Sequence, residues 1–332
     1  MSRRSPVPTR RSAIACGLVA CFAATAVAPV LAADDFPSKP ITIVIGYPAG
    51  GSTDLVGRIV GTELSNRLKQ TVVIENLGGA GGAIGAQKVA KAPADGYTLL
   101  VAANNEMAIA PLINKAVKYD AFKDFTPIGL VATQPMVLVA SPKTGVKNTQ
   151  EFINLVAQNP SKYSYGSSGI GTALHLAGEM VQQSGQLEMT HVPYKGVAPL
   201  TNDLVGNNLE FGVFVLSSGL PHIKSGKVVA LGTTEAKRSS ATPDIPALAE
   251  NPKFKGVDIN SWFALMGPAG LPQPVVAKIK SALNEALQSP DFRSKLEASG
   301  NVVASPQVDM AGFHRNEVAK YKKIVDTAKI EE

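Results

Sequence analysis

The chain has 332 residues, a formal net charge of +6 and two cysteines. Residues 1–33 hold four arginines and no acidic residue, so the remaining 299 residues carry 28 basic and 26 acidic side chains, a net charge of +2. This balance predicts no nucleic-acid partner. Both cysteines, Cys16 and Cys21, lie in the first 33 residues, so the rest of the chain cannot form disulfides and depends on its hydrophobic cores.

Residues 1–33 have the layout of a cleavable export signal. A start with four arginines precedes an apolar run, residues 13–32, and small residues at Ala32 and Ala33 provide a cleavage site. Three alternatives stay open. The run of about 20 residues just suffices for a membrane anchor, the string LVAC at 18–21 fits a lipoprotein box with Cys21 lipidated, and two adjacent arginines at 10–11 fit a twin-arginine signal. Cleavage is favoured because the run is alanine-rich and interrupted by glycine and proline.

The chain after residue 33 alternates short apolar strands with amphipathic helices, which is typical of parallel α/β sheets. Strands are predicted at 41–47, 71–76 and 97–102, with helices after the first two. The long apolar stretch 128–141, bent at Pro135, is predicted to be the first crossing between two lobes.

The second lobe repeats the alternation. Helices are predicted at 149–158, 172–184 and 197–205, and strands at 163–167, 189–194, 211–215 and 228–234. Segment 259–272 is then the return crossing, and helices at 273–289, 290–299 and 306–329 close the chain. The pattern predicts an α/β receptor of two Rossmann-like lobes with a two-strand hinge: residues 34–135 and 260–332 form lobe 1, and residues 136–259 form lobe 2.

Three segments combine a strand end, a glycine-rich turn and a helix start: YPAGGSTD (47–54), LGGAGGAIGA (77–86) and YGSSGIGT (165–172). Glycine lets the backbone approach a ligand closely, and a helix start offers unpaired N–H groups. Hydroxyl donors are added by Ser52, Thr53, Ser167, Ser168 and Thr172. Because ligands in α/β sheets bind at the carboxyl ends of strands, these turns predict a carboxylate site. The alternative, that the hydroxyls are only helix N-caps, stays open.

Other chemistries fit poorly. No glycine turn is followed by the lysine of a phosphate-binding loop, and the glycines of 79–85 have the wrong spacing for a dinucleotide site. The segment GSSG (166–169) is not a serine-nucleophile motif. His175 and Glu179 lie one helical turn apart without a third metal ligand nearby in the sequence. Asp54, in a first helical turn, is more typical of a residue that complements the helix dipole. We therefore expect no catalytic residue, no metal and no cofactor.

Six segments, 36–54, 72–100, 163–179, 191–199, 221–231 and 261–272, together cover nearly the whole chain after residue 35 and follow one another in the order of a known family. In these segments the chain resembles the substrate-binding proteins of tripartite tricarboxylate transporters, the TctC-like or Bug-type periplasmic receptors. The resemblance implies a periplasmic, non-enzymatic receptor with the type II two-lobed binding-protein fold. Such a receptor closes on a small ligand whose carboxylate is held by backbone N–H groups, hydroxyls and bridging water.

Carried over residue by residue, the resemblance implies one set of ligand-binding residues: Tyr47, Ala49, Gly50, Gly51, Ser52, Thr53, Asp54, Ala80, Gly81, Asn104, Ser167, Ser168 and Thr172. The chain departs from the family twice. It has IGYP where an apolar–proline pair is frequent, and GVFVLSSG after residue 210 where Asp or Asn is common. Val215, Leu216 and Ser217 would then line the far end of the cleft, which indicates a ligand with an apolar or uncharged distal part.

Two functions follow from the resemblance. The first is a monomeric receptor that delivers a carboxylate to the membrane subunits of a tripartite tricarboxylate-type transporter. The alternative is an exported sensor that presents the carboxylate to a membrane histidine kinase. An enzyme that uses the glycine turns as an oxyanion site is a distant third.

Overall fold

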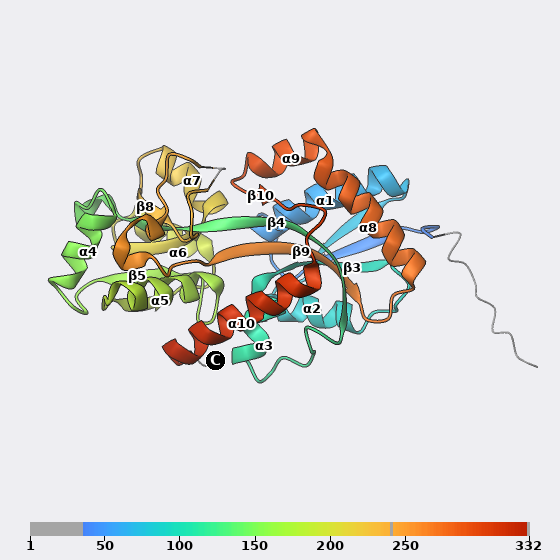
Figure 1. Ribbon diagram of the computed structural model, residues 1–332, viewed down its shortest axis with the longest axis horizontal. Helices are drawn as coiled ribbons and strands as arrows, with labels where there is room; N and C mark the ends of the chain where they lie inside the picture. The colour runs from blue at the N-terminus through green and yellow to red at the C-terminus, as the bar shows by residue number, and fades with distance from the viewer. Residues whose placement is uncertain (1–35, 240–241, 331–332) are drawn as a thin grey trace, which may run out of the picture. The chain divides into compact units, whose positions relative to one another are not determined.

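The computed structural model describes residues 36–239 and 242–330, so the expected export signal and its cleavage site lie outside the described residues. Ten strands form one mixed sheet in the order β2-β1-β3-β9-β4-β7-β5-β6, and β8 and β10 both pair with β4. Helices cover both faces of this sheet (Figure 1). Among the described residues, no helix combines the length and the apolar composition that crossing a membrane requires.

The first half of the sheet is built on three parallel strands: β1 (Ile41–Ile45), β2 (Val72–Asn76) and β3 (Thr98–Ala103). Successive side chains of a strand point to opposite faces. Ile43 and Ile45 accordingly pack in one core cluster with α1 (Ser52–Leu68) and α8 (Gln273–Gln288). Val44 packs in another cluster with α2 (Ala83–Ala90). Burial on both faces explains why these strands are continuously apolar.

The second half repeats this plan with other segments. β5 (Ser164–Ser167) lies parallel to β6 (Thr190–Pro193) and to β7 (Phe211–Val215). The helices of this half are α4 (Thr149–Ala157), α5 (Ala173–Gly185) and α6 (Val197–Val205). β8 (Val229–Thr233) pairs with the same end of β4 as β7 does, on the opposite side of β4.

Two long strands join the halves, β4 (Phe125–Ala140) and β9 (Asn260–Pro268), and they run side by side across the molecule (Figure 1). They are antiparallel because each carries the chain between the halves once, in opposite directions. The sheet is therefore mixed: its strands are parallel within each half, as the alternation of elements predicted, and the two crossing strands are antiparallel. β4 pairs with β9 as far as Pro135 and with β7 and β8 from Met136 or Val137 onward. The stretch expected to bend at Pro135 is one continuous strand of 16 residues in which the pairing partner changes.

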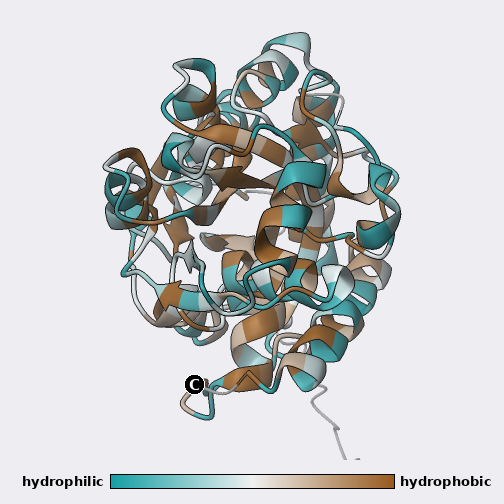
Figure 2. Ribbon diagram, turned by 90° about the vertical axis from the view of Figure 1, so that its left-hand side faces the viewer, coloured by the Kyte–Doolittle hydropathy of each residue, from teal (hydrophilic) through white to brown (hydrophobic). Residues whose placement is uncertain are grey.

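The chain closes with α8, α9 (Pro290–Glu297), the short strand β10 (Val302–Val303) and α10 (Met310–Ala328). α10 begins at Met310, later than the predicted residue 306, because Asp309 is its N-cap and accepts a hydrogen bond from the Ala311 amide. Hydrophobic residues lie mainly on the strands and on the inward faces of the helices, while hydrophilic residues lie outside (Figure 2).

Three elements near the strand ends were not predicted. A π-helical turn, η2 (Asn105–Ile109), and the short helix α3 (Ala110–Ile113) follow β3. The helix α7 (Leu216–Lys224) follows β7 directly. Its Gly219 and Pro221 argue against a helix in the sequence, but Leu216 is fully buried and joins the core cluster that contains Phe214.

Candidate functional site

The turn before α1 leaves its hydroxyls free of helix capping. Gly51 is the N-cap, with φ −84° and ψ 174°, and no side chain caps the helix. The alternative that Ser52 and Thr53 are N-caps is therefore wrong for this turn. Both residues lie in the first helical turn, where backbone N–H groups have no helical acceptor. Thr53 is buried, and its hydroxyl makes no hydrogen bond among the described residues.

Asp54 holds this turn in place. Its Oδ2 accepts hydrogen bonds from the Gly50 amide (2.9 Å) and from Arg58 Nε (3.0 Å), and its Oδ1 accepts from Asn76 Nδ2 (2.9 Å). Burial raises the pKa of Asp54, but the three hydrogen bonds outweigh it and bring the pKa below its ordinary value. Asp54 is thus an ionised carboxylate with its donors already supplied, which supports the turn.

The second glycine segment lies directly against the first. A Cβ at Gly46 would lie 2.6 Å from the Gly82 carbonyl oxygen, so only glycine permits this approach. The short 3₁₀ turn η1 (Ala80–Gly82) has positive φ at all three residues, 48°, 58° and 97°. The Tyr47 hydroxyl lies 3.0 Å from the Gly81 carbonyl oxygen and 2.5 Å from Glu106 Oε2. Tyr47 therefore links the two segments.

Glu106 is a site residue that the sequence did not reveal. It is fully buried in η2, and its Oε1 accepts a hydrogen bond from the Ala103 amide at 2.6 Å. Burial raises the pKa of Glu106 to about 7, although the hydrogen bonds from Tyr47 and Ala103 oppose this rise. The available signal was an acidic residue within the otherwise apolar stretch after the third strand.

The neighbouring asparagines have different partners. Asn105 Oδ1 accepts a hydrogen bond from the Ala173 amide at 2.9 Å, at the first residue of α5. Asn104, the residue that was predicted, is buried, and its Nδ2 donates to the Tyr321 hydroxyl (2.8 Å) and to the Asn260 carbonyl oxygen (3.3 Å). Asn104 is thus hydrogen-bonded to α10 and β9. Asn105, which was not predicted, is hydrogen-bonded to α5 in the second half of the molecule.

The turn before α5 is built from its own hydroxyls. Thr172 is the N-cap of α5: its Oγ1 accepts from the His175 amide (3.4 Å) and donates to the Gly169 carbonyl oxygen (2.8 Å). Ser168 Oγ donates to Thr172 Oγ1 at 3.2 Å. Ser167 is fully buried, and its Oγ lies 2.7 Å from His191 Nε2. Thr172 is therefore an N-cap, as one interpretation of these hydroxyls predicted.

Two stacked histidines, His175 and His191, lie beside this turn. The rings of His175 and His191 lie 3.8 Å apart with 8° between their planes, and Tyr165 stacks on His191 at 4.9 Å. Burial lowers the pKa of His175 to about 4. Burial and the neighbouring His175 lower the pKa of His191 to about 3. Both rings are therefore neutral at pH 7. His175 Nε2 lies 3.7 Å from Glu179, and no three potential metal ligands gather among residues 36–239 and 242–330.

A serine pair connects the first turn with α7. Ser52 Oγ lies 2.7 Å from Ser217 Oγ, which donates to Gln134 Oε1 at 3.1 Å. Gln134 is fully buried and donates to the Ser299 carbonyl oxygen at 2.8 Å. The structure thus brings Ser217 beside the first turn. Val215 is the N-cap of α7, and the Leu216 side chain is buried in the core.

These contacts join segments that follow β1, β2, β3, β5 and β7. Most predicted residues therefore lie at the carboxyl ends of the parallel strands of the two halves, which run in opposite directions so that these ends face each other. The donors offered there are backbone N–H groups and hydroxyls, and the charge of Asp54 is paired with Arg58. Neutral donors of this kind hold a carboxylate without a counter-charge.

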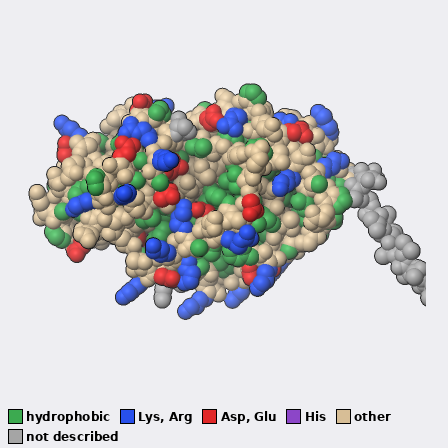
Figure 3. Space-filling model, viewed as in Figure 1, with side chains coloured by type: hydrophobic (Ala, Val, Ile, Leu, Met, Phe, Trp, Pro, Cys, Tyr) green, Lys and Arg blue, Asp and Glu red, His purple; other side chains and the backbone are tan. Residues whose placement is uncertain are grey.

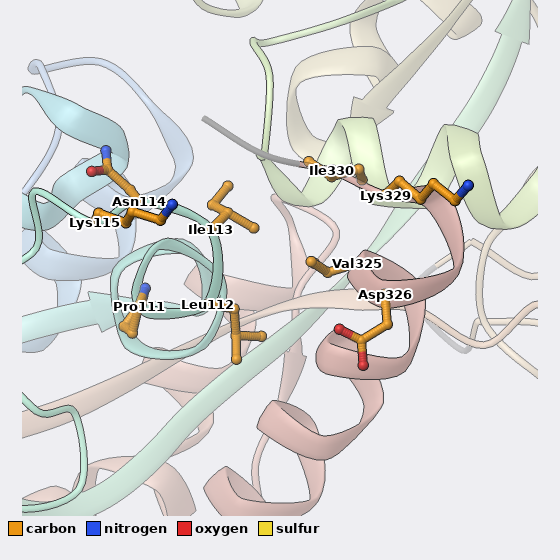
Figure 4. A pocket seen from close by; sticks show the side chains of 9 residues that line it. All are labelled: Pro111, Leu112, Ile113, Asn114, Lys115, Val325, Asp326, Lys329 and Ile330. Carbon is orange, nitrogen blue, oxygen red and sulfur yellow. The ribbon is translucent and has the colours of Figure 1, made fainter.

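Two other hollows lie away from these turns. One, of about 470 Å³, lies between α3 and the end of α10, where Leu112 and Ile113 face Val325 and Ile330 (Figure 4). The other, of about 330 Å³, is lined by Phe122, His314 and residues near them. Basic side chains gather over α3 and α10 along the lower edge of the face in Figure 3. Neither hollow contains a residue predicted to bind the ligand.

The chain is similar to known proteins over most of its length. A family model described as "Tripartite tricarboxylate transporter family receptor" matches residues 56–330. Protein BugT of Bordetella pertussis is 32% identical over 314 residues, 93% of this chain and 95% of BugT.

Solved structures show the same likeness. The R. palustris protein Rpa4515, solved with adipate, is 32% identical with a TM-score of 0.83, covering 90% of this chain and 99% of that one. MatC from Rhodopseudomonas palustris, solved with malate, is 29% identical with a TM-score of 0.77, covering 87% and 100%. These similarities confirm the α/β two-lobed binding-protein fold that the sequence predicted.

Proposed function

The chain belongs to the tripartite tricarboxylate transporter receptor family, and from that premise we propose that it captures a small dicarboxylate in the periplasm and delivers it to the membrane subunits of such a transporter. The observation that carries the proposal is the turn before α1, where helix N–H groups and two hydroxyls are left free of capping. The solved relatives that hold adipate and malate support a dicarboxylate as the ligand class.

One carboxylate of the ligand accepts hydrogen bonds from the start of α1 and from Thr53, and Ala49, Ala80 and Gly81 flank it. Ser217, beside Ser52, lies where the ligand reaches the second half of the sheet. The Ser217 hydroxyl there can donate a hydrogen bond to the second carboxylate, so the proposal of a dicarboxylate replaces the expectation of an uncharged distal part.

We further propose that residues 34–135 and 260–332 form one lobe and residues 136–259 the other. The change of pairing partner at Pro135 and the start of β9 at Asn260 support these boundaries. Closure about the two strands reduces the radius of gyration, which small-angle scattering detects with and without ligand. Identical curves under saturation count against the hinge.

The protein acts as a monomer, without a cofactor, after removal of residues 1–33. Intact mass spectrometry that finds a lipid on Cys21 contradicts this processing.

Thermal unfolding in the presence of a carboxylate panel tests the proposal: adipate, malate, citrate, an amino acid and an aromatic acid. A ligand at 100 times its dissociation constant adds about 2.7 kcal/mol to the free energy of unfolding. A response to adipate or malate supports the dicarboxylate assignment, whereas no response to any carboxylate contradicts it.

Gly51→Val is the variant that tests whether the start of α1 binds the carboxylate. A Cβ at Gly51 would meet only the Pro48 carbonyl oxygen, at 3.8 Å, and φ is negative, so the variant folds. The added side chain nevertheless obstructs approach of a carboxylate to the start of α1. Because valine is a poorer N-cap than glycine, we expect Gly51→Val to remain folded with a loss of about 1 kcal/mol of stability and to lose the ligand response.

A further inference from the structure

The Tyr47 hydroxyl has one proton and two acceptors. Glu106 Oε2 lies 2.5 Å away and the Gly81 carbonyl oxygen 3.0 Å away. If Glu106 is ionised, both acceptors compete for that proton. If Glu106 is protonated, it donates to the Tyr47 oxygen, and Tyr47 donates to Gly81. Only the second arrangement gives the Gly81 carbonyl oxygen, which belongs to an exposed residue, a donor within the protein.

The surroundings of Glu106 also favour the neutral acid. Gly82 is packed so closely that a Cβ there would lie 2.7 Å from Glu106 Oε2. The titratable groups that face η2 are Tyr47, Tyr119 and His314. The Tyr119 hydroxyl donates to the Glu106 main-chain carbonyl, and His314 Nε2 lies on the Met107 carbonyl. On α2, Lys88 is paired with Glu75. Within the described residues, Glu106 thus has no cation as a hydrogen-bond or ion-pair partner.

We propose that Glu106 is a positioning residue which, as the neutral acid, links through Tyr47 the first glycine turn (46–52) to the second (78–82), and whose ionisation weakens carboxylate binding between them. The second half of this inference rests on the proposed function, whereas the first half concerns the two turns alone.

Ionisation acts on the site in two ways. The Tyr47 hydroxyl keeps its proton but donates its hydrogen bond to the Glu106 carboxylate, so the Gly81 carbonyl loses this donor and the second turn loosens. In addition, a negative charge forms in a buried position behind turns that receive an anion. Because burial raises the pKa of Glu106 to about 7, affinity for a carboxylate falls above neutral pH. One proton taken up on binding gives at most about a tenfold loss per pH unit.

The first experiment needs no ligand. Denaturant unfolding of wild type and Glu106→Gln is measured from pH 4 to 9. The folded-state pKa is raised above the unfolded value of about 4.3. The stabilisation that neutral Glu106 contributes to the folded state is therefore complete below pH 4 and is lost as pH rises to about 7. Relative to Glu106→Gln, the folding equilibrium constant of the wild type falls roughly a hundredfold across this window. Parallel curves overturn the proposal.

Glu179→Gln is the matched control, because the Tyr165 hydroxyl donates to Glu179 Oε1 at 2.6 Å in a similar tyrosine–carboxyl pair. If loss of any tyrosine–carboxyl pair explained the effect, Glu179→Gln would change the pH dependence of unfolding as Glu106→Gln does. If ionisation of Glu106 explains it, only Glu106→Gln changes it. If Glu106→Gln fails to fold, Tyr47→Phe tests the same link: it removes the shared hydroxyl and abolishes the dependence of the second turn on pH, seen in amide hydrogen exchange at residues 80–82. Unchanged exchange in this variant overturns the proposal.

The second experiment uses adipate as the probe, from pH 6 to 9, by titration calorimetry. We expect the affinity of the wild type to fall up to about tenfold per unit above pH 7, and that of Glu106→Gln to stay level. Equal profiles overturn the coupling to binding. If adipate and the rest of the carboxylate panel fail to bind while the ligand-free curves diverge, the link between the turns is supported and the proposed function fails.

Discussion

Two turns with nearly the same composition, residues 47–54 before α1 and residues 165–172 before α5, use their hydroxyls in opposite ways. In the second turn, Thr172 caps its helix and Ser168 donates to Thr172. In the first turn, no side chain caps the helix, and Ser52 reaches Ser217, far along the chain. Glycine, serine and threonine at a strand–helix junction are therefore compatible with both a scaffold and a binding site.

The difference arises from what replaces the hydroxyls as structural support. Asp54 holds the first turn through three hydrogen bonds, and this charge releases Ser52 and Thr53 for other partners. The second turn has no such carboxylate and depends on Ser167, Thr172 and the stacked histidines. When a carboxylate such as Asp54 keeps a turn in shape, the hydroxyls and amides of that turn can donate hydrogen bonds to a ligand.

The largest effect is expected from removing that support. Asp54→Ala takes away three hydrogen bonds, two of them from side chains and one from the Gly50 amide. At about 1 kcal/mol each, the free energy of unfolding falls by about 2–3 kcal/mol. Because the first turn loses its shape, carboxylate affinity falls by more than about a hundredfold. Chemical denaturation and calorimetry measure the two effects.

Asp120→Ala is the control for Asp54→Ala. Asp120 accepts hydrogen bonds from the Phe122 and Lys123 amides in a turn that holds no predicted ligand-binding residue. It should lower stability slightly and leave affinity intact. An equal loss of affinity in both variants would mean that general destabilisation, and not the shape of the first turn, governs binding.

The next effect concerns a donor in the first turn. Thr53→Ala removes a hydroxyl that caps no helix. A hydrogen bond to a charged acceptor contributes about 1.5–3 kcal/mol, so affinity should fall ten- to more than a hundredfold. The melting temperature should remain close to that of the wild type. Unchanged affinity with a lower melting temperature would contradict the comparison and make Thr53 a structural residue.

The sequence revealed the two turns but not their difference in use. Strand periodicity and glycine placement predict strand–turn–helix junctions because both are local properties, and the sheet brings their ends together. Hydroxyl partners depend on contacts distant in the chain, such as Ser52 with Ser217. The role of Glu106 depends on complete burial, and the choice between Asn104 and Asn105 depends on the backbone of a π-helical turn. α7 was missed because burial of Leu216 overrides the local preferences of Gly219 and Pro221.

A third prediction separates the turns by pH. The folded-state pKa values of His175 and His191, about 4 and about 3, lie below the unfolded value of about 6.5. The unfolded chain therefore binds protons first, and stability of the second turn is lost as pH falls from about 6.5 towards 4. The lowered pKa of Asp54 preserves the first turn until pH falls below about 4.

In the Glu106→Gln background, where the opposite contribution of Glu106 is absent, we expect a loss of about 3 kcal/mol between pH 7 and 4, roughly what one of the two coupled histidines contributes. Amide hydrogen exchange resolves the two segments and should show residues 167–173 losing protection before residues 50–55. Loss of both segments at the same pH would show that the two turns do not respond independently.

The smallest effect tests the scaffold side of the comparison. Thr172→Ala removes the N-cap of α5, which costs about 1 kcal/mol of stability. Affinity should change by less than about twofold, because the α5 amides remain and the Ala173 amide is already bound to Asn105. Thr172→Ser, which keeps the hydroxyl, should restore most of the lost stability and serves as the matched control. If Thr172→Ala instead lowers affinity as strongly as Thr53→Ala and leaves the melting temperature unchanged, Thr172 donates to the ligand. The two turns would then form one continuous carboxylate site, with Asp54 and the histidine pair as alternative ways of supporting it.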